Sequence, residues 1–158
     1  MWALPGMRVI VPHQQKYEWD DTYGAVEVSR AGSVFCFQST VHQEASGKFL
    51  DQIVAHDPAA IHVILQDGAG FHLPENDPRL PGNVRIITLP ADSPELNPVE
   101  KLWDHLKDAI CHRVFATVEE LRAALAGWLR EFWSDGARAL PLVGRGWLLA
   151  SVNAGGKC

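Results

Sequence analysis

Two acidic residues, Asp67 and Glu100, occupy positions suited to metal chemistry. Asp67 directly follows the apolar run IHVILQ at residues 61–66, and Glu100 lies within SPELNPVEKLW at residues 93–103. We expect the first segment to form a strand and the second to begin a helix, which places each carboxylate at the end of an element. Magnesium prefers oxygen ligands and usually takes one or two carboxylates from a protein. We therefore predict that Asp67 and Glu100 are metal-binding, catalytic residues.

The chemistry available to two carboxylate-bound metal ions is in-line attack on a phosphodiester. Ions roughly 3.5–4 Å apart activate a water or a 3′-hydroxyl and stabilise the leaving oxygen. The segment Gly68-Ala69-Gly70 after Asp67 keeps bulk away from this carboxylate. His72 is a candidate to assist the site or to orient a substrate phosphate, but a structural hydrogen-bonding role is the commoner one. Because the site is rich in oxygen, we do not expect His72 to bind the metal.

Each acid also has a structural interpretation. Glu100 follows Asn97 by three residues, so it could complete a capping box at the start of the helix, and local chemistry alone favours this role. Asp67 precedes a glycine and could equally be a turn residue. The local sequence alone does not decide whether each acid binds a metal ion or has a structural role.

The elements that must position these acids follow an α/β order in a single domain at residues 1–158. We predict strands at 8–12, 23–28 and 33–37, a helix at 46–56, strands at 61–66 and 84–89, and helices capped by Asn97 and by Thr117. The first three strands would form an antiparallel meander. The strand at 61–66 is continuously apolar, which predicts burial on both faces in the middle of a sheet.

Composition excludes several classes of protein. The chain has 158 residues with a formal net charge of −5, unlike a strongly basic nucleic-acid binder. No apolar run is long enough to span a membrane, so we expect no membrane association and a cytoplasmic location. Three widely separated cysteines indicate neither a disulfide framework nor a zinc site. Basic residues gather at 101–130, as either a phosphate-facing patch or a solvated helix face: Lys101, Lys107, His112, Arg113, Arg122 and Arg130.

Two segments together resemble the catalytic core of DDE-type insertion-sequence transposases, in the branch related to mariner elements. They are DGAGFH at 67–72 and LPADSPELNPVEKLWDHLK at 89–107. The second and third acids of that family's triad map onto Asp67 and Glu100, which are 33 positions apart. WALPG at 2–6 and RVFATVEEL at 113–121 extend the resemblance over nearly the whole chain.

The resemblance implies an RNase H-like mixed sheet flanked by helices. It also implies magnesium or manganese as cofactor, DNA at element ends and target as substrate, and a homodimer or a full-length transposase as partner. Accessory or DNA-contacting roles would fall to residues in and around the two motifs: His72, Asn97, Lys101, Lys107 and Arg113.

One part of the family pattern has no counterpart here. In the family, the first catalytic aspartate lies on the opening strand, upstream of the segment that resembles WALPG. We therefore expect this chain to be the C-terminal part of the catalytic domain, without the first strand and the helix-turn-helix region, and to be inactive alone. Asp20 and Asp21 fall where the family has its second strand, so neither is assigned the first catalytic role.

Two other functions compete with this interpretation. One is a non-catalytic module that binds DNA or a full-length transposase through the basic residues of 101–130. The other is a different RNase H-like nuclease, which the helix start SPELNPVE disfavours.

Overall fold

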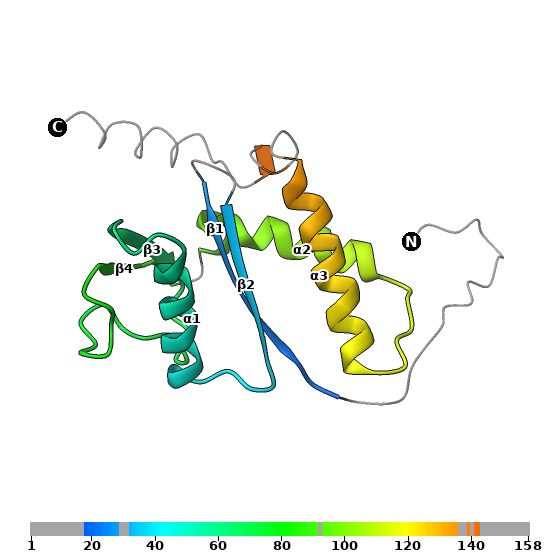
Figure 1. Cartoon of the computed structure of the whole chain (residues 1–158), viewed down its shortest axis with the longest axis horizontal. Coiled ribbons are helices and arrows are strands. Elements are labelled where there is room, and N and C mark those ends of the chain that lie inside the picture. The colour runs from blue at the N-terminus through cyan, green and yellow to red at the C-terminus, as the bar shows by residue number, and fades with distance from the viewer. Residues whose placement is uncertain (1–17, 29–31, 92, 136–138, 140, 143–158) are drawn as a thin grey trace.

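The computed structural model describes residues 18–28, 32–91, 93–135, 139 and 141–142. Its elements follow the predicted α/β order (Figure 1): β1 (Asp21–Glu27), β2 (Gly32–Gln38), α1 (Gln43–His56), β3 (His62–Gln66), β4 (Val84–Thr88), the short 3-10 helix η1 (Pro94–Leu96), α2 (Pro98–Ile110) and α3 (Val118–Ser134). The predicted strand at 8–12 and the motif at 2–6 lie outside the described residues. The mixed α/β class is confirmed for the part that is described.

The described strands form two separate pairs. Strands β1 and β2 are antiparallel, with Asp21 opposite Gln38 at one end and Glu27 opposite Gly32 at the other. Strands β3 and β4 are parallel and end together, because Gln66 lies opposite Thr88. The chain therefore leaves both parallel strands at the same edge of the sheet, which is where Asp67 lies.

Helix α1 lies between the two strand pairs and packs against both (Figure 1). Its Phe49 is buried with Tyr23 of β1, whereas its Leu50 is buried with residues of the parallel pair and its loop, namely Leu73, Val84 and Ile86. The helix begins at Gln43 rather than at the predicted Ser46. The reason is the side chain of His42, whose Nδ1 accepts a hydrogen bond from the Ala45 N–H (3.0 Å) and caps the helix.

Helices α2 and α3 form the largest buried cluster, which also contacts the β1–β2 pair. Leu102 of α2 is fully buried at its centre, and the other buried members are Leu106, Leu125, Leu129, Phe132 and Ala139. Gly24 of β1 allows a close approach here, since a Cβ at this position would lie 2.8 Å from the Trp103 ring. The apolar side chains of α2 thus hold the start of this helix against β1.

Strand β3 is more exposed than its apolar sequence predicted. Val63 is 56% exposed and the preceding Ile61 is 71% exposed, so the expectation of burial on both faces is wrong for the described part of the chain. The cause is that the α1 cluster covers only the face that carries Ile64. In addition, β3 pairs with β4 on one edge, and no described strand pairs with its other edge.

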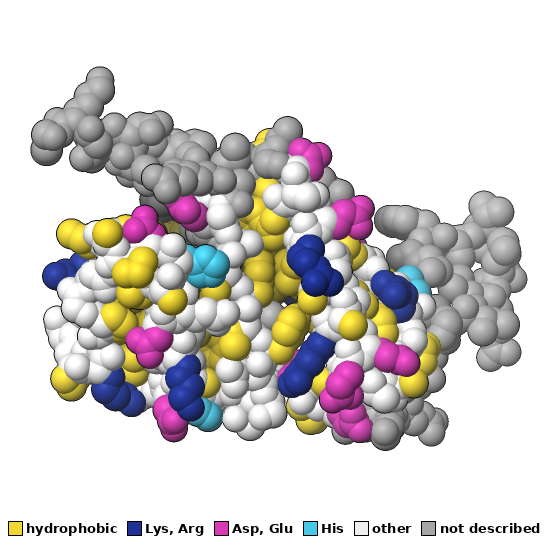
Figure 2. Space-filling view, in the orientation of Figure 1, with side chains coloured by type: hydrophobic (Ala, Val, Ile, Leu, Met, Phe, Trp, Pro, Cys, Tyr) yellow, Lys and Arg dark blue, Asp and Glu magenta, His cyan; other side chains and the backbone are white. Residues whose placement is uncertain are grey.

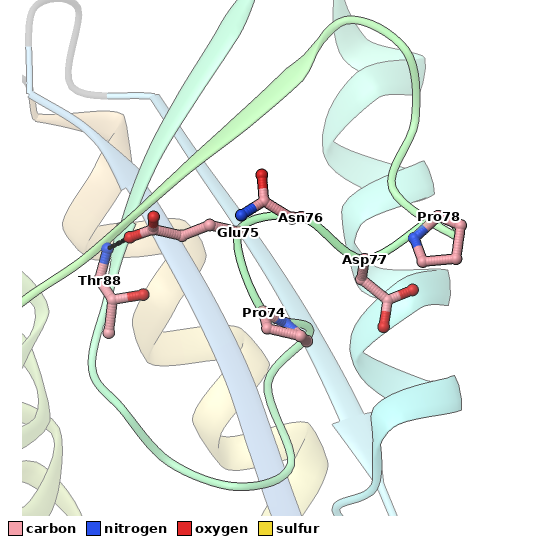
Figure 3. Close-up of a pocket in the computed structure, with 6 residues that line it drawn as sticks. All are labelled: Pro74, Glu75, Asn76, Asp77, Pro78 and Thr88. Atoms are coloured by element: carbon pink, nitrogen blue, oxygen red, sulfur yellow. Dashed lines mark hydrogen bonds between the residues drawn. The ribbon is translucent and has the colours of Figure 1, made fainter.

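The outer edge of β4 is covered by the loop that joins the two parallel strands. One carboxylate oxygen of Glu75 accepts a hydrogen bond from the Thr88 N–H (2.9 Å), as Figure 3 shows. At the other end of the strand, the Pro81 carbonyl accepts a hydrogen bond from the Val84 N–H (2.9 Å). Among the described residues, the first and last N–H groups of β4 are therefore occupied on its outer edge, whereas no strand pairs with the outer edge of β3. No helix in the described residues combines the length and apolar character needed to cross a membrane.

Candidate active site

The two predicted acids line one cavity. It has a volume of about 210 Å³ and lies where β3 and β4 end and α2 begins, with Asp67, Gly68, Leu89, Pro90, Ala91, Ser93, Asn97 and Glu100 around it. The parallel pairing of β3 and β4 delivers Asp67 and Leu89 to this edge, since the Leu89 N–H donates to the Gln66 carbonyl (2.7 Å). The structure therefore brings together Asp67, Glu100 and Asn97 from among the predicted site residues.

Glu100 is placed by the start of helix α2. Asn97 caps this helix as predicted: its Oδ1 accepts a hydrogen bond from the Val99 N–H (3.1 Å), and Pro98 occupies the first helical position. The Glu100 N–H donates to the Asn97 carbonyl (3.2 Å). In the described structure no hydrogen bond joins the Glu100 carboxylate to the Asn97 N–H, so the capping-box role is not formed. Glu100 is instead one of the residues that line the cavity.

Asp67 is both a turn residue and a cavity residue. Its Oδ1 accepts a hydrogen bond from the Ala69 N–H (3.1 Å), which confirms the turn interpretation. The side chain is nevertheless 55% exposed. A carboxylate has two oxygens, and no contact with Oδ2 is seen among the described residues, so the turn does not prevent metal binding.

His72 lies beside Asp67, with its Nε2 3.3 Å from Asp67 Oδ1. Its side chain is 22% exposed, and this burial lowers the pKa of the imidazole, although the Asp67 carboxylate acts in the opposite direction. The ring is therefore neutral at pH 7. His72 is not among the residues that line the cavity.

The loop from Asp67 to Leu73 is fastened by residues that the sequence did not identify. Buried Gln66 donates from Nε2 to the Leu73 carbonyl (2.8 Å), and Gln43 of α1 donates to the Gly70 carbonyl (3.4 Å). Tyr23 of β1 packs edge-on against Phe71, with ring centroids 6.0 Å apart. The one sequence signal was Gln66 itself, a polar residue that ends an apolar strand and must find a partner once buried.

The predicted basic contacts are not gathered at the cavity. Lys101, Lys107 and Arg113 are all exposed, and none of them lines it. Lys107 lies 3.6 Å from the Asp104 carboxylate, and the Arg113 guanidinium lies over the Phe115 ring. On the face shown in Figure 2, Lys and Arg side chains are interspersed with Asp and Glu rather than forming one patch. The single phosphate-facing patch considered for residues 101–130 is not visible on that face.

A larger cavity of about 530 Å³ lies along the β3–β4 loop, lined by Pro74, Glu75, Asn76, Asp77, Pro78 and Thr88 (Figure 3). Its acids are engaged in structural contacts. Glu75 holds the Thr88 N–H, and Asp77 is bound to Arg79 through both carboxylate oxygens (2.8 and 2.7 Å). The smaller cavity is therefore the better candidate for chemistry.

The donor set of the smaller cavity suits a hard divalent cation. Two carboxylates from the protein leave the remaining coordination positions of the ion to water and substrate, which is the usual arrangement for magnesium. Among the residues that the structure describes, no three side chains of His, Cys, Asp or Glu come together as a metal cluster.

Comparison with known proteins finds a family match over most of the chain. Residues 1–122 match the family described as DDE superfamily endonuclease. An uncharacterized protein, y4pE/y4sA of Sinorhizobium fredii (strain NBRC 101917 / NGR234), is 34% identical over 110 residues, which cover 65% of this chain and 77% of that protein. No solved structure matches the chain.

Proposed function

The chain belongs to the DDE superfamily endonucleases, and we propose that it forms part of the catalytic domain of a mariner-related insertion-sequence transposase. This family acts on DNA and generally uses a divalent metal ion. In the proposed function, Asp67 and Glu100 are the second and third acids of the metal site. The intact enzyme would cut DNA at element ends and join it to a target.

The observation that carries the proposal is the shared cavity of Asp67 and Glu100. The two residues come from a strand end and from a helix start, and they line one cavity because β3, β4 and α2 converge. The structural role considered for each acid leaves its carboxylate available to a metal ion. Asp67 keeps Oδ2 outside the turn, and the Glu100 carboxylate has no hydrogen bond in the described structure.

Magnesium or manganese would be held by Asp67 and Glu100. When bound, such ions activate the attacking water or 3′-hydroxyl and stabilise the leaving oxygen. The protein itself contributes by holding the metal ligands in position. The turn at Asp67 and the cap at Asn97 fix the two carboxylates, and the first turn of α2 adds the positive end of a helix dipole near the substrate phosphate.

The RNase H-like fold proposed for this domain needs one more strand. No strand in the described part of the chain pairs with the other edge of β3, which ends next to Asp67, and the exposed side chains of Ile61 and Val63 would gain a neighbour if one did. We propose that the remaining acid of the triad is carried on a strand that pairs with this edge. DNA cleavage would require the acid on that strand together with Asp67 and Glu100.

Titration of the full chain with Mn²⁺, followed by electron paramagnetic resonance, tests the metal site. Asp67→Ala and Glu100→Ala should each abolish detectable binding, because each removes half of the protein's ligands. Asp104→Ala is the matched control, since Asp104 lies on the same helix as Glu100 but is exposed outside the cavity. Binding that survives both site substitutions would show that the metal site is elsewhere and the proposal is wrong.

The alternative is a non-catalytic DNA-binding module, favoured by the exposure of Lys101, Arg113 and Arg130 away from the cavity. It predicts DNA binding that weakens with salt, occurs without nicking and is unaffected by Asp67→Ala. Lys101→Ala combined with Arg113→Ala should then reduce the salt dependence. Magnesium-dependent nicking that is lost in both Asp67→Ala and Glu100→Ala would exclude this alternative.

A further inference from the structure

We propose that His72 is a positioning residue for Asp67, a role that rests on the proposed function because it concerns how Asp67 meets a metal ion. In this role, the Nε2–H of His72 holds Asp67 Oδ1 against the loop and leaves Oδ2 as the oxygen available to the metal. Asp67 would then bind the metal through one oxygen only. The metal would contact Asp67 and never His72.

Within the described part of the chain, the polar contacts of the Asp67 carboxylate all fall on one oxygen. Oδ1 receives the Ala69 N–H at 3.1 Å and lies 3.3 Å from His72 Nε2. Both groups belong to the loop that follows β3, close to Asp67 in sequence. With Oδ1 occupied in this way, the carboxylate would offer only Oδ2 to a metal ion. The metal would therefore lie on the Oδ2 side of the carboxylate.

The ring of His72 is held in place by its neighbours. It packs against Phe71 with centroids 4.5 Å apart and stands edge-on to Tyr23 of β1 at 6.5 Å. Its backbone N–H donates to the Ala69 carbonyl (3.0 Å), closing the same turn that supplies the Ala69 N–H to Asp67. The ring therefore cannot move away from Asp67 without disturbing two aromatic contacts and the turn.

The competing role for His72 is direct metal ligation through Nε2. The two roles need opposite tautomers, since a donor carries hydrogen on Nε2 whereas a ligand offers a lone pair there and keeps its hydrogen on Nδ1. The ¹⁵N chemical shifts of the imidazole in the metal-free protein distinguish the tautomers. Hydrogen on Nε2 is the expected result, and hydrogen on Nδ1 overturns the proposal.

Metal titration of variants completes the test. His72→Phe keeps the aromatic packing and removes the donor, and should weaken Mn²⁺ binding about tenfold, as loss of such outer partners does in other metal sites. His72→Gln places an amide N–H near the position of Nε2 and should recover most of the affinity. Circular dichroism of both variants confirms that they fold.

Two different failures are distinguishable. If Asp67→Ala abolishes Mn²⁺ binding while His72→Phe leaves it unchanged, the metal site stands and the role of His72 is wrong. If Asp67→Ala leaves Mn²⁺ binding unchanged, the proposed function itself fails, and the role of His72 at the metal fails with it.

Discussion

Arg122 of helix α3 binds Asp20, the residue that precedes strand β1, through two hydrogen bonds of 2.6 and 2.8 Å. The carboxylate of Asp20 is 8% exposed, so it is enclosed by this contact. Asp20 falls where the family has its second strand and was assigned no catalytic role; here it pairs with α3 and is not among the residues that line the cavity.

Replacing Asp20 should destabilise the protein without affecting the metal site. Asp20→Ala leaves the Arg122 guanidinium without its partner and frees the start of β1 from α3, so the melting temperature should fall. The neighbouring Asp21→Ala makes the same change of charge and should cost less. Thermal unfolding by circular dichroism measures both, and equal melting temperatures would contradict the structural role of the Asp20–Arg122 pair.

Two glycines should respond in opposite directions to alanine. A Cβ at Gly24 would lie 2.7 Å from the Phe35 ring and 2.8 Å from the Trp103 ring, so Gly24→Ala should destabilise the fold by about 1–3 kcal/mol. Gly127 lies within α3 with nothing within 4 Å of the same position. Gly127→Ala should therefore stabilise by roughly 0.5–1 kcal/mol, because it reduces the freedom of the unfolded chain. Urea unfolding of both variants measures whether each substitution lowers or raises the free energy of unfolding.

The Asn97 cap should matter for stability and for metal binding together. Asn97→Ala removes the acceptor of the Val99 N–H and should cost about 1 kcal/mol. Because the same turn places Glu100, Mn²⁺ binding should weaken as well. Asn97→Ser keeps a capping oxygen and should restore both properties. An Asn97→Ala variant that loses stability but keeps full metal affinity would show that the cap does not position Glu100.

Acid should loosen the loop between β3 and β4 only at very low pH. Hydrogen bonds from the Arg79 guanidinium, together with one from its backbone N–H, lower the pKa of Asp77 from 3.8 to about 2. A depressed carboxyl pKa means that the stabilising contact is fully present above 3.8 and is lost as the pH falls through about 2. The ¹³C shift of the Asp77 carboxyl should titrate in that range. In Arg79→Ala the titration should move back toward 3.8.

Local signals in the sequence predicted the start of α2 well. Asn97, Pro98 and Glu100 form the helix start as expected, because capping depends on residues a few positions apart. The end of the same helix had no such signal. His112, directly after the cap residue Cys111, adopts a φ of 64°, a left-handed conformation that more often belongs to glycine.

Long-range features could not be predicted in the same way. The exposure of Val63 depends on which elements cover each face of β3. The sequence of an apolar strand does not show whether one of its faces is buried or both are. The cap of α1 by His42, which makes the helix begin at Gln43, could not be predicted because histidine is an uncommon cap. Tyr23 could not be connected with His72 because their contact depends on the packing of β1 against the loop.

The uneven edges of the β3–β4 pair set a limit on self-association. Glu75 and Pro81 occupy backbone donors on the β4 side, while the β3 side has no such cover in the described structure. Two copies that met along β3 would form a four-stranded sheet whose two outer edges were both β4. In the described residues, the N–H groups of Val84 and Thr88 would already be engaged at both outer edges, so further growth by strand addition would be disfavoured.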